Sequence, residues 1–489
     1  MCGITAGSAL LVRIKWLLRT TGLLLIGTRL YGQAPPQFSD RPWHSVEERQ
    51  VVTEGRRIHV PAVHIDPAKV YTLAELIDLA EANNPETRVA WESARAQAAA
   101  LGIARSELFP SLAAVALAGV DRQEAALGSR FSRQTIPSFQ LTLELNYTIF
   151  DFGARRGRIN AESARLLAAN FGFNDVHREL IYAVSQAYYR LLNAAGQEEA
   201  AGASLVNAQT VQQAAEARLH NGLATLPDVL EARSSTAQAQ YDLQAVLGAK
   251  EIARGDLVTA LGAPAATAIR VQPLTEVPTP DSVADTVEEA INRALEQRPD
   301  LQAGVAEIRL AQAEHRQARA ALYPNLSVSA TPSAQSLYLL QQTFPWGHSA
   351  DLTGGVRVSL NWTVFDGGAR RGRLAQAEAH IRGAEAQVSA TRDQIEDQVW
   401  ISYTNLTTAF RQRQAAAELV SAATQSYSAA LESYNYGVRN LLDVTNAQKV
   451  LAQARATEIL ARTQVLTAIA ELAFRTGDAI QSNARRVHQ

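Results

Sequence analysis

Residues 150–158, Phe-Asp-Phe-Gly-Ala-Arg-Arg-Gly-Arg, return at residues 365–373 as Phe-Asp-Gly-Gly-Ala-Arg-Arg-Gly-Arg, 215 residues later and with one mismatch. Other landmarks recur at the same spacing to within one residue. They are Pro85 with Pro299, Tyr188 with Tyr403, Gly222 with Gly437, Asp228 with Asp443, and Gly262 with Gly477. A repeat of this length predicts that one structural unit was duplicated and fused.

The composition argues against several classes of protein. The net charge of the 489 residues is −2, so no nucleic-acid partner is expected. Cys2 is the only cysteine, which leaves no internal disulfide and no cysteine-based metal site. The nine histidines are scattered, and no phosphate loop or nucleophile elbow is present. We therefore expect no catalytic residue, no metal and no cofactor, and the protein is predicted not to be an enzyme.

The first 32 residues are predicted to be a signal peptide. Arg13, Lys15 and Arg19 precede a short apolar stretch at 23–26, and a plausible cleavage zone follows at 31–33. An inner-membrane anchor is the alternative, but the apolar stretch is shorter than the roughly 20 residues that a membrane-spanning helix needs. No long apolar run appears after residue 33. Strands of a membrane β-barrel would escape such a search because their apolar residues alternate with polar ones.

Proline and repeat positions divide the rest of the chain. Residues 33–70 are proline-rich and are predicted to form an extended N-terminal arm. Repeat 1 covers 71–262, and a linker with four prolines follows at 263–281. Repeat 2 covers 282–477, and a tail without periodicity ends the chain at 478–489.

Both repeats predict the same elements. In repeat 1, helices are expected near 72–84, 86–108, 154–220 and 226–261, with a β-hairpin at about 111–150 whose strands lie near 111–120 and 138–150. In repeat 2, helices are expected near 282–296, 299–322, 369–436 and 440–475, with a β-hairpin at about 325–365 whose strands lie near 325–333 and 352–365.

The strands are predicted to have one apolar and one polar face. Leu141, Leu143 and Leu145 alternate with polar residues, and Val356, Val358 and the residues after them do the same. Four such strands cannot close a barrel, because the smallest membrane barrels have about eight. An open sheet would leave unpaired backbone groups in lipid. The chain must therefore oligomerise, and three copies would supply a closed twelve-stranded wall.

The helix lengths predict an elongated molecule. A helix of about 67 residues is roughly 100 Å long. In repeat 1 the helices at 86–108 and 226–261, laid end to end, would run beside the long helix for nearly its full length, and repeat 2 copies this plan. Each repeat is therefore expected to be a long α-hairpin, with its β-hairpin at the end opposite the Gly222 or Gly437 turn.

Over about residues 71–477 the chain resembles the TolC-like outer-membrane efflux proteins. The features that carry the resemblance are the doubled Phe-Asp-x-Gly-x-Arg-Arg junction, the very long helices and the doubled Gly-then-Asp-Val tip. It implies a mixed α and β membrane protein, in which long helices form a periplasmic α-barrel and four strands per chain contribute to a trimeric transmembrane β-barrel.

The resemblance also implies a function and partners. A homotrimer in the bacterial outer membrane, extending into the periplasm, would be the passive exit duct of a tripartite efflux or type I secretion system. Its partners would be a periplasmic adaptor protein, an inner-membrane pump and outer-membrane lipid. The alternative is a periplasmic coiled-coil scaffold without a pore, which would not need alternating strands.

Two tip segments, about 218–230 and 433–446, contain the residues that the resemblance assigns to gating. A periplasmic gate is expected from Asp228, Tyr434 and Arg439, with Arg439 and Asp228 able to form a charge-assisted hydrogen bond. Asp443 matches an acidic constriction, and Asn446 stands where the best-known members have a second aspartate. The adaptor would dock at the tips on Gly222, Leu223 and Gly437.

The strand–helix junctions are expected to be structural. Asp151 and Asp366 are predicted to cap the long helices, and Gly153 and Gly368 to allow the change of direction. Arginines in a first helical turn oppose the helix dipole. Two explanations stay open for them, contact with anionic lipid headgroups and ion pairing with a neighbouring helix. These arginines are Arg155, Arg156, Arg158, Arg370, Arg371 and Arg373.

Overall fold

The computed structural model describes residues 46–57, 65–127, 130–273, 286–341 and 347–478. The predicted signal peptide and the tail beyond Asp478 lie outside these residues. The chain divides into two compact units, 1–64 and 65–489. In the first unit, helix α2 spans Val46–Arg57, which corrects the prediction of a fully extended arm. The segment has no proline, and its glutamates precede its closing arginines, as the helix dipole favours.

The second unit holds the predicted helices in the predicted order. From the first half of the chain come α3 (Leu73–Asn83), α4 (Pro85–Ser106), α5 (Ala154–His220) and α6 (Leu226–Ala260). From the second half come α7 (Val287–Gln297), α8 (Pro299–Ala320), α9 (Ala369–Asn435) and α10 (Leu441–Thr476). Helices α5 and α9 have 67 residues each.

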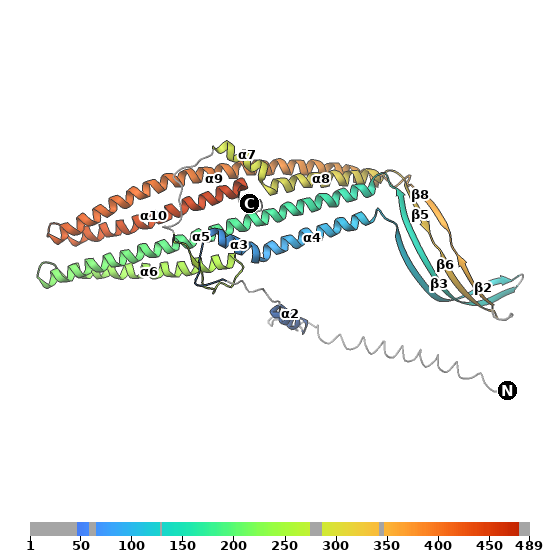
Figure 1. The fold of residues 1–489 in the computed structure, drawn as a ribbon, viewed down its shortest axis with the longest axis horizontal. Coiled ribbons are helices and arrows are strands. Elements are labelled where there is room, and N and C mark those ends of the chain that lie inside the picture. Colours follow the sequence, from blue (N-terminus) through green and yellow to red (C-terminus); the bar gives the residue numbers. More distant parts are fainter. Residues whose placement is uncertain (1–45, 58–64, 128–129, 274–285, 342–346, 479–489) are drawn as a thin grey trace, which may run out of the picture. The chain divides into compact units, whose positions relative to one another are not determined.

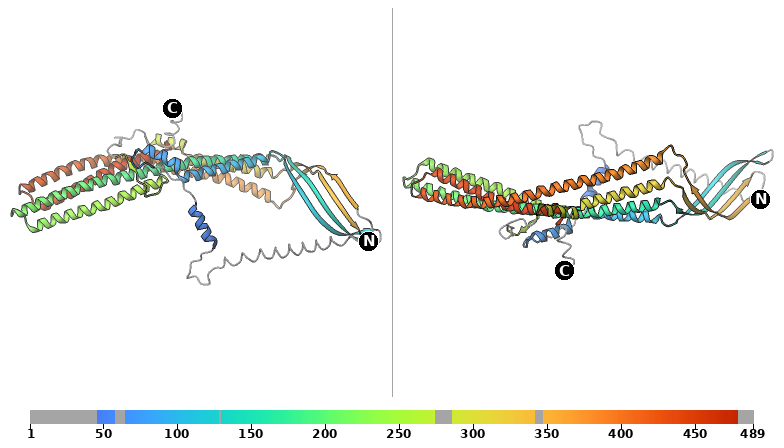
Figure 2. Two further views of the ribbon diagram at one scale, coloured as in Figure 1. Left: turned by 60° about the horizontal axis from the view of Figure 1, so that its bottom comes forward. Right: turned by 90° about the horizontal axis from the view of Figure 1, so that it is seen from above.

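The helices lie along one another in two sets (Figure 1). Helix α4 accompanies α5 near the strands and α6 accompanies it toward the other end, while α8 and α10 do the same for α9. The strands lie at one end of this unit and the α5–α6 and α9–α10 turns at the other, as both views of Figure 2 also show. The expected position of the strands opposite the tips is confirmed.

The sheet is longer than predicted. Strands β2 (Ser111–Leu127) and β3 (Arg130–Phe150) form one hairpin, and they continue through residues that were expected to be a loop. That stretch has polar residues on both faces, so it lacks the alternation that marks a strand.

The second hairpin is divided into four strands, where two were predicted. They are β5 (Asn325–Ala330), β6 (Ser333–Gln341), β7 (Gly347–Thr353) and β8 (Val356–Asn361). The interruptions oppose each other, because the ideal Cβ of Gly354 would lie 2.9 Å from Pro332 Cα. Proline lacks a backbone donor, so it cannot continue a ladder in mid-strand. Strand β3 crosses the break and pairs with both β5 and β6.

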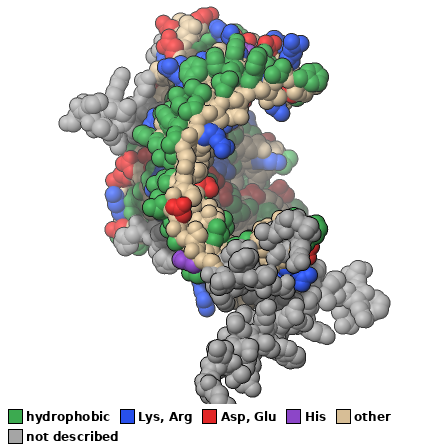
Figure 3. Space-filling view, turned by 90° about the vertical axis from the view of Figure 1, so that its right-hand side faces the viewer, with side chains coloured by type: hydrophobic (Ala, Val, Ile, Leu, Met, Phe, Trp, Pro, Cys, Tyr) green, Lys and Arg blue, Asp and Glu red, His purple; other side chains and the backbone are tan. Residues whose placement is uncertain are grey.

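The two faces of the sheet differ as predicted. Antiparallel partners share a face, and Tyr147, Val328 and Val358 lie across from one another. On the opposite face, Thr142 and Ser333 are buried, with their hydroxyls 2.9 Å apart. Figure 3, seen from the strand end, shows hydrophobic side chains gathered along the convex side of the curved sheet.

The linker contains a strand that the sequence did not predict. Strand β4 (Arg270–Val271) pairs in parallel with β1 (Val70–Tyr71), which spans the boundary between the predicted arm and repeat 1. Residues of the arm and of the linker therefore lie side by side, held by backbone hydrogen bonds that include Gln272 N to Tyr71 O at 3.1 Å.

Small residues let the long helices approach closely. Most of the buried hydrophobic residues of α5, α8 and α9 are alanines. Gly196 of α5 is the tightest case in this bundle, since an ideal Cβ there would lie 2.7 Å from Ile459 Cγ2 of α10. A Cβ at Gly248 of α6 would meet nothing within 4 Å.

Gly196→Ala and Gly248→Ala should therefore have opposite effects on stability. The alanine at 196 overpacks the α5–α10 contact and should lower the free energy of unfolding by about 1–2 kcal/mol. The alanine at 248 only restricts the unfolded chain and should raise it by about 0.5–1 kcal/mol. Thermal melting of the purified protein, followed by circular dichroism, measures both. Equal shifts of the same sign would contradict the close approach.

Candidate functional site

The strand–helix junction is built around Asp151. Its carboxylate accepts hydrogen bonds from the backbone N–H groups of Gly153 at 3.1 Å and Arg155 at 2.9 Å. Gly153 has a φ of 93°, a left-handed conformation that favours glycine. The second copy repeats this, with Asp366 accepting from Gly368 at 3.2 Å and Arg370 at 3.0 Å. Both aspartates thus satisfy free donors at the start of a long helix.

Ion pairing accounts for half of the junction arginines. Arg155 Nε lies 2.9 Å from Asp151 Oδ2, and Arg370 Nε lies 2.8 Å from Asp366 Oδ2. Arg158 pairs with Glu107, in the turn after α4. For these three the lipid hypothesis is unnecessary. Within the part of the chain that the structure describes, the side chains of Arg156, Arg371 and Arg373 have no such partner.

The pKa of the Asp151 carboxyl lies below its usual range. Partial burial raises this pKa, but the hydrogen bonds from Arg155 and Gly153 and the nearby guanidinium outweigh burial. A depressed pKa in the folded state means that the ionised carboxylate stabilises the fold at neutral pH. That stabilisation is lost as the pH falls through the folded-state pKa.

Asp151→Asn should therefore lower the free energy of unfolding at pH 7 by about 1–2 kcal/mol, as loss of a charged helix cap does. The gap between wild type and variant should close at pH values well below about 4, where the unfolded carboxyl is protonated. Thermal melting from neutral to acidic pH measures this gap. Asp242→Asn, on the exposed face of α6, is the control and should change the free energy of unfolding little at neutral or acidic pH. A gap independent of pH would contradict the charged cap.

The tips lie where the long helices end. Gly222 and Gly437 both take positive φ, 69° and 76°, and their turns close through backbone hydrogen bonds to the last helical turn. Leu223 and Val438 follow these glycines and are 66% and 79% exposed. Each tip thus presents a bare glycine turn with a projecting apolar side chain.

The three predicted gate residues occupy neighbouring tips with different environments. The Asp228 carboxylate accepts from the backbone N–H of Thr225 at 2.8 Å and from its hydroxyl at 2.7 Å, which lowers the pKa of Asp228. Tyr434 is 4% exposed, and burial raises the pKa of its hydroxyl. This hydroxyl has no hydrogen-bond partner among the described residues. Arg439 is exposed, and within the described residues of one chain its side chain forms no ion pair. The expected Arg439–Asp228 bond is therefore absent within one chain.

Arg218 is the tip residue that sequence reasoning missed. From the last turn of α5 it donates to Tyr434 O at 2.7 Å and to Asn435 O at 3.1 Å. Its guanidinium lies 4.7 Å from the centroid of the Tyr434 ring. A positive charge at the C-terminus of α9 interacts favourably with the helix dipole. The only available signal was an arginine four residues before Gly222, a common residue at a helix end.

Arg218→Ala should loosen the end of α9, because Tyr434 O and Asn435 O lose a charged donor worth about 1.5–3 kcal/mol. Amide hydrogen exchange of residues 430–441 should become faster by tenfold or more, as roughly 1.4 kcal/mol per tenfold implies. Arg233→Ala is the matched control, since Arg233 pairs on the surface with Glu216 of α5. Unchanged exchange in Arg218→Ala, or equal acceleration in the control, would refute the clamp.

Asp443 and Asn446 stand in the first turns of α10. Asn440 caps this helix, with its side chain accepting from Asp443 N at 3.0 Å. The Asp443 carboxylate is thus not needed as the cap, and Asn446 is exposed three residues further on. Residues at this spacing share one helix face, so both are presented on the same side of α10.

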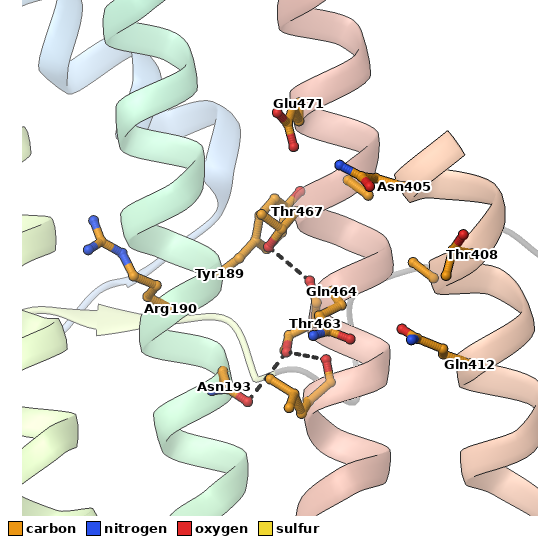
Figure 4. A pocket seen from close by; sticks show the side chains of 13 residues that line it. Tyr189, Arg190, Asn193, Asn405, Thr408, Gln412, Thr463, Gln464, Thr467 and Glu471 are labelled. Atoms are coloured by element: carbon orange, nitrogen blue, oxygen red, sulfur yellow. Dashed lines mark hydrogen bonds between the residues drawn. The ribbon is translucent and has the colours of Figure 1, made fainter. Parts of the chain in front are cut away.

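A polar groove away from the tips has a different chemistry. Side chains from α5, α9 and α10 surround a cavity of about 430 Å³, and most of them are amides and hydroxyls (Figure 4). Thr463 donates to Ile459 O at 3.0 Å and to Asn193 Oδ1 at 3.4 Å. The lining has no histidine or cysteine, and its amides and hydroxyls offer hydrogen bonds.

The described residues contain neither a cluster suited to a metal ion nor a helix suited to crossing a membrane. No cluster of three or more histidine, cysteine, aspartate or glutamate side chains there could hold a metal ion. Among the helices of those same residues, none combines the length and apolar character needed to cross a membrane.

Known proteins place the chain in a family. The profile of the outer membrane efflux protein family matches twice, at residues 76–263 and 290–478. The chain is 27% identical over 407 residues to protein CyaE of Bordetella pertussis, covering 83% of this chain and 84% of CyaE. It is 27% identical over 384 residues to outer membrane protein OprJ of Pseudomonas aeruginosa, covering 77% and 78% of the two chains.

The fold agrees with these matches. A crystal structure of a membrane protein from Pseudomonas aeruginosa superposes with a TM-score of 0.74 at 26% identity, covering 83% of this chain and 93% of that one. Fold and sequence together define a channel protein of the outer membrane that extends into the periplasm, in a family of channels and not of enzymes. The chain belongs to the outer membrane efflux protein family. The predicted resemblance is confirmed, and the scaffold without a pore is disfavoured.

Proposed function

We propose that three copies of this chain form the exit duct of a tripartite exporter, with a closed barrel in the outer membrane and a helical tunnel below it. The two-faced sheet carries the proposal. Strand β2 on one edge and strands β7 and β8 on the other pair on one side only, so an isolated copy has unpaired backbone groups beside apolar side chains. Closure of three sheets into one wall would satisfy these groups. Each copy would contribute two fused repeats, 71–262 and 282–477.

The tips would form the periplasmic gate. Arg439 is exposed and forms no ion pair among the described residues of one copy, although Asp228 lies on the neighbouring tip of that copy. The Arg439–Asp228 pair would therefore form between copies. Three Asp443 carboxylates would make an acidic constriction that favours cations. Opening would break the contacts between copies, and the pump would supply the energy. An adaptor would dock on Gly222, Leu223 and Gly437, where each turn leaves bare backbone.

Conductance in planar bilayers tests the duct. Purified wild-type protein should give discrete steps with cation preference. Asp443→Asn should reduce that preference, because it removes three charges from the constriction. Asn446→Asp is the matched control and should increase it, because it adds a second acidic ring on the same face of α10.

A silent wild type calls for one further variant. Arg439→Ser removes the proposed contact between copies and should release steps from a gate that is merely shut. Continued silence from correctly inserted trimers would refute the duct. Conductance steps with the same ion preference in wild type, Asp443→Asn and Asn446→Asp would refute the acidic constriction alone.

A further inference from the structure

A basic groove lies between α5 and α8, close to the strands. It encloses about 580 Å³, and among its lining residues are Arg156, Asn160, Arg316 and Arg319, with no carboxylate. We call these four residues the junction groove. The first turn of α5 supplies one arginine and the last turns of α8 supply the other two.

A close helix contact brings these arginines together. An ideal Cβ at Gly157 would lie 3.0 Å from Gln317 N, so α5 and α8 approach almost to backbone contact there. Arg156 and Arg316 are the sequence neighbours of those two residues. Like charges at such a contact repel each other unless an anion lies between them.

Among the described residues, no protein group neutralises the groove. All three arginines are exposed, and none of their side chains has an ion pair or hydrogen bond among the residues that the structure describes. Nearby arginines behave differently, since Arg158 pairs with Glu107 and Arg165 with Glu162 and Glu314. The charge of the junction groove is therefore available to a ligand.

Aromatic contacts place the groove on the apolar side of the sheet. A bulge between Thr148 and Phe150 brings Phe150 opposite Leu326, on the apolar face. Phe150 contacts Phe152 edge-on with ring centroids 4.7 Å apart, and Phe152 stacks on Tyr323 at 4.9 Å. Phe152 and Tyr323 both line the groove. The apolar face thus continues directly into the basic groove.

Exposed aromatic residues lie at all four boundaries between helices and strands, which are α4–β2, β3–α5, α8–β5 and β8–α9. They are Phe109, Phe150, Phe152, Tyr323, Trp362 and Phe365, each at least 45% exposed. Aromatic girdles of this kind lie at the interface between hydrocarbon and headgroups. A basic groove just beyond such a girdle lies at headgroup depth.

We infer that the junction groove binds the phosphate headgroup of an anionic phospholipid in the periplasmic leaflet of the outer membrane. The acyl chains would follow Phe152 and Phe150 onto the apolar face, and Asn160 would donate to the headgroup beside the arginines. This inference rests on the proposed function, because only the barrel's place in the membrane brings lipid to this depth.

Native mass spectrometry of the detergent-purified full chain tests it. Wild type should bind phosphatidylglycerol about tenfold or more tightly than zwitterionic phosphatidylcholine, since each arginine near a lipid surface contributes to anion preference. The triple variant R156Q/R316Q/R319Q should lose this preference. The matched triple R88Q/R382Q/R411Q removes the same charge from exposed arginines elsewhere on α4 and α9 and should keep it.

Several results would overturn the inference. Equal phosphatidylglycerol preference in wild type and R156Q/R316Q/R319Q would do so, as would loss of preference in both triples. Complete displacement of the lipid by millimolar inorganic phosphate would show a site for free anions instead. Conductance of the same preparations separates this test from the proposed function. A conducting wild type without lipid preference refutes only the groove, whereas lipid preference in a protein that never conducts refutes only the duct.

Discussion

Unpaired strand edges beside an apolar face are the constraint on which this structure depends. Inside a bilayer each free N–H or C=O group costs several kcal/mol, so an apolar sheet can exist there only if its edges are paired. One copy pairs β2 through β8 internally and leaves both outer edges open. The helices inherit this requirement, because β3 and β8 lead through capped junctions into α5 and α9. The assembly and the helical tunnel that we propose would therefore follow from hydrogen bonding in the sheet.

The junctions show how charge is handled where the chain leaves the sheet. Asp151 both caps α5 and pairs with Arg155, so one carboxylate serves the free amides and one cation together. Arg156, the next residue, points into a groove without any acid. Adjacent arginines in one motif thus have different environments, one internal to the fold and one open to its surroundings. A motif read only as a string of basic residues hides this division.

Much of the fold could be predicted from sequence because its signals are long and local. The 67 residues of α5 contain no proline and end at His220, just before the Asn221–Gly222 turn, so both ends were predicted correctly. The hairpin ends were missed, since Asp121 to Glu124 show no alternation, and the interruption at Pro332 and Gly354 needs two segments to face each other. The Arg218 clamp and the junction groove also join residues far apart in sequence. A single sequence read on its own carries no signal for such pairs.

The bulge before Phe150 also limits how this segment can change in evolution. Side chains alternate along a strand, so one extra residue reverses every side chain that follows it. The bulge between Thr148 and Phe150 supplies one such reversal, which keeps Phe150 on the apolar face and Asp151 at the start of α5. A single insertion or deletion here would turn Phe150 toward the polar face. We therefore expect this segment to gain or lose residues only in pairs, so that its length stays odd or even while its sequence changes.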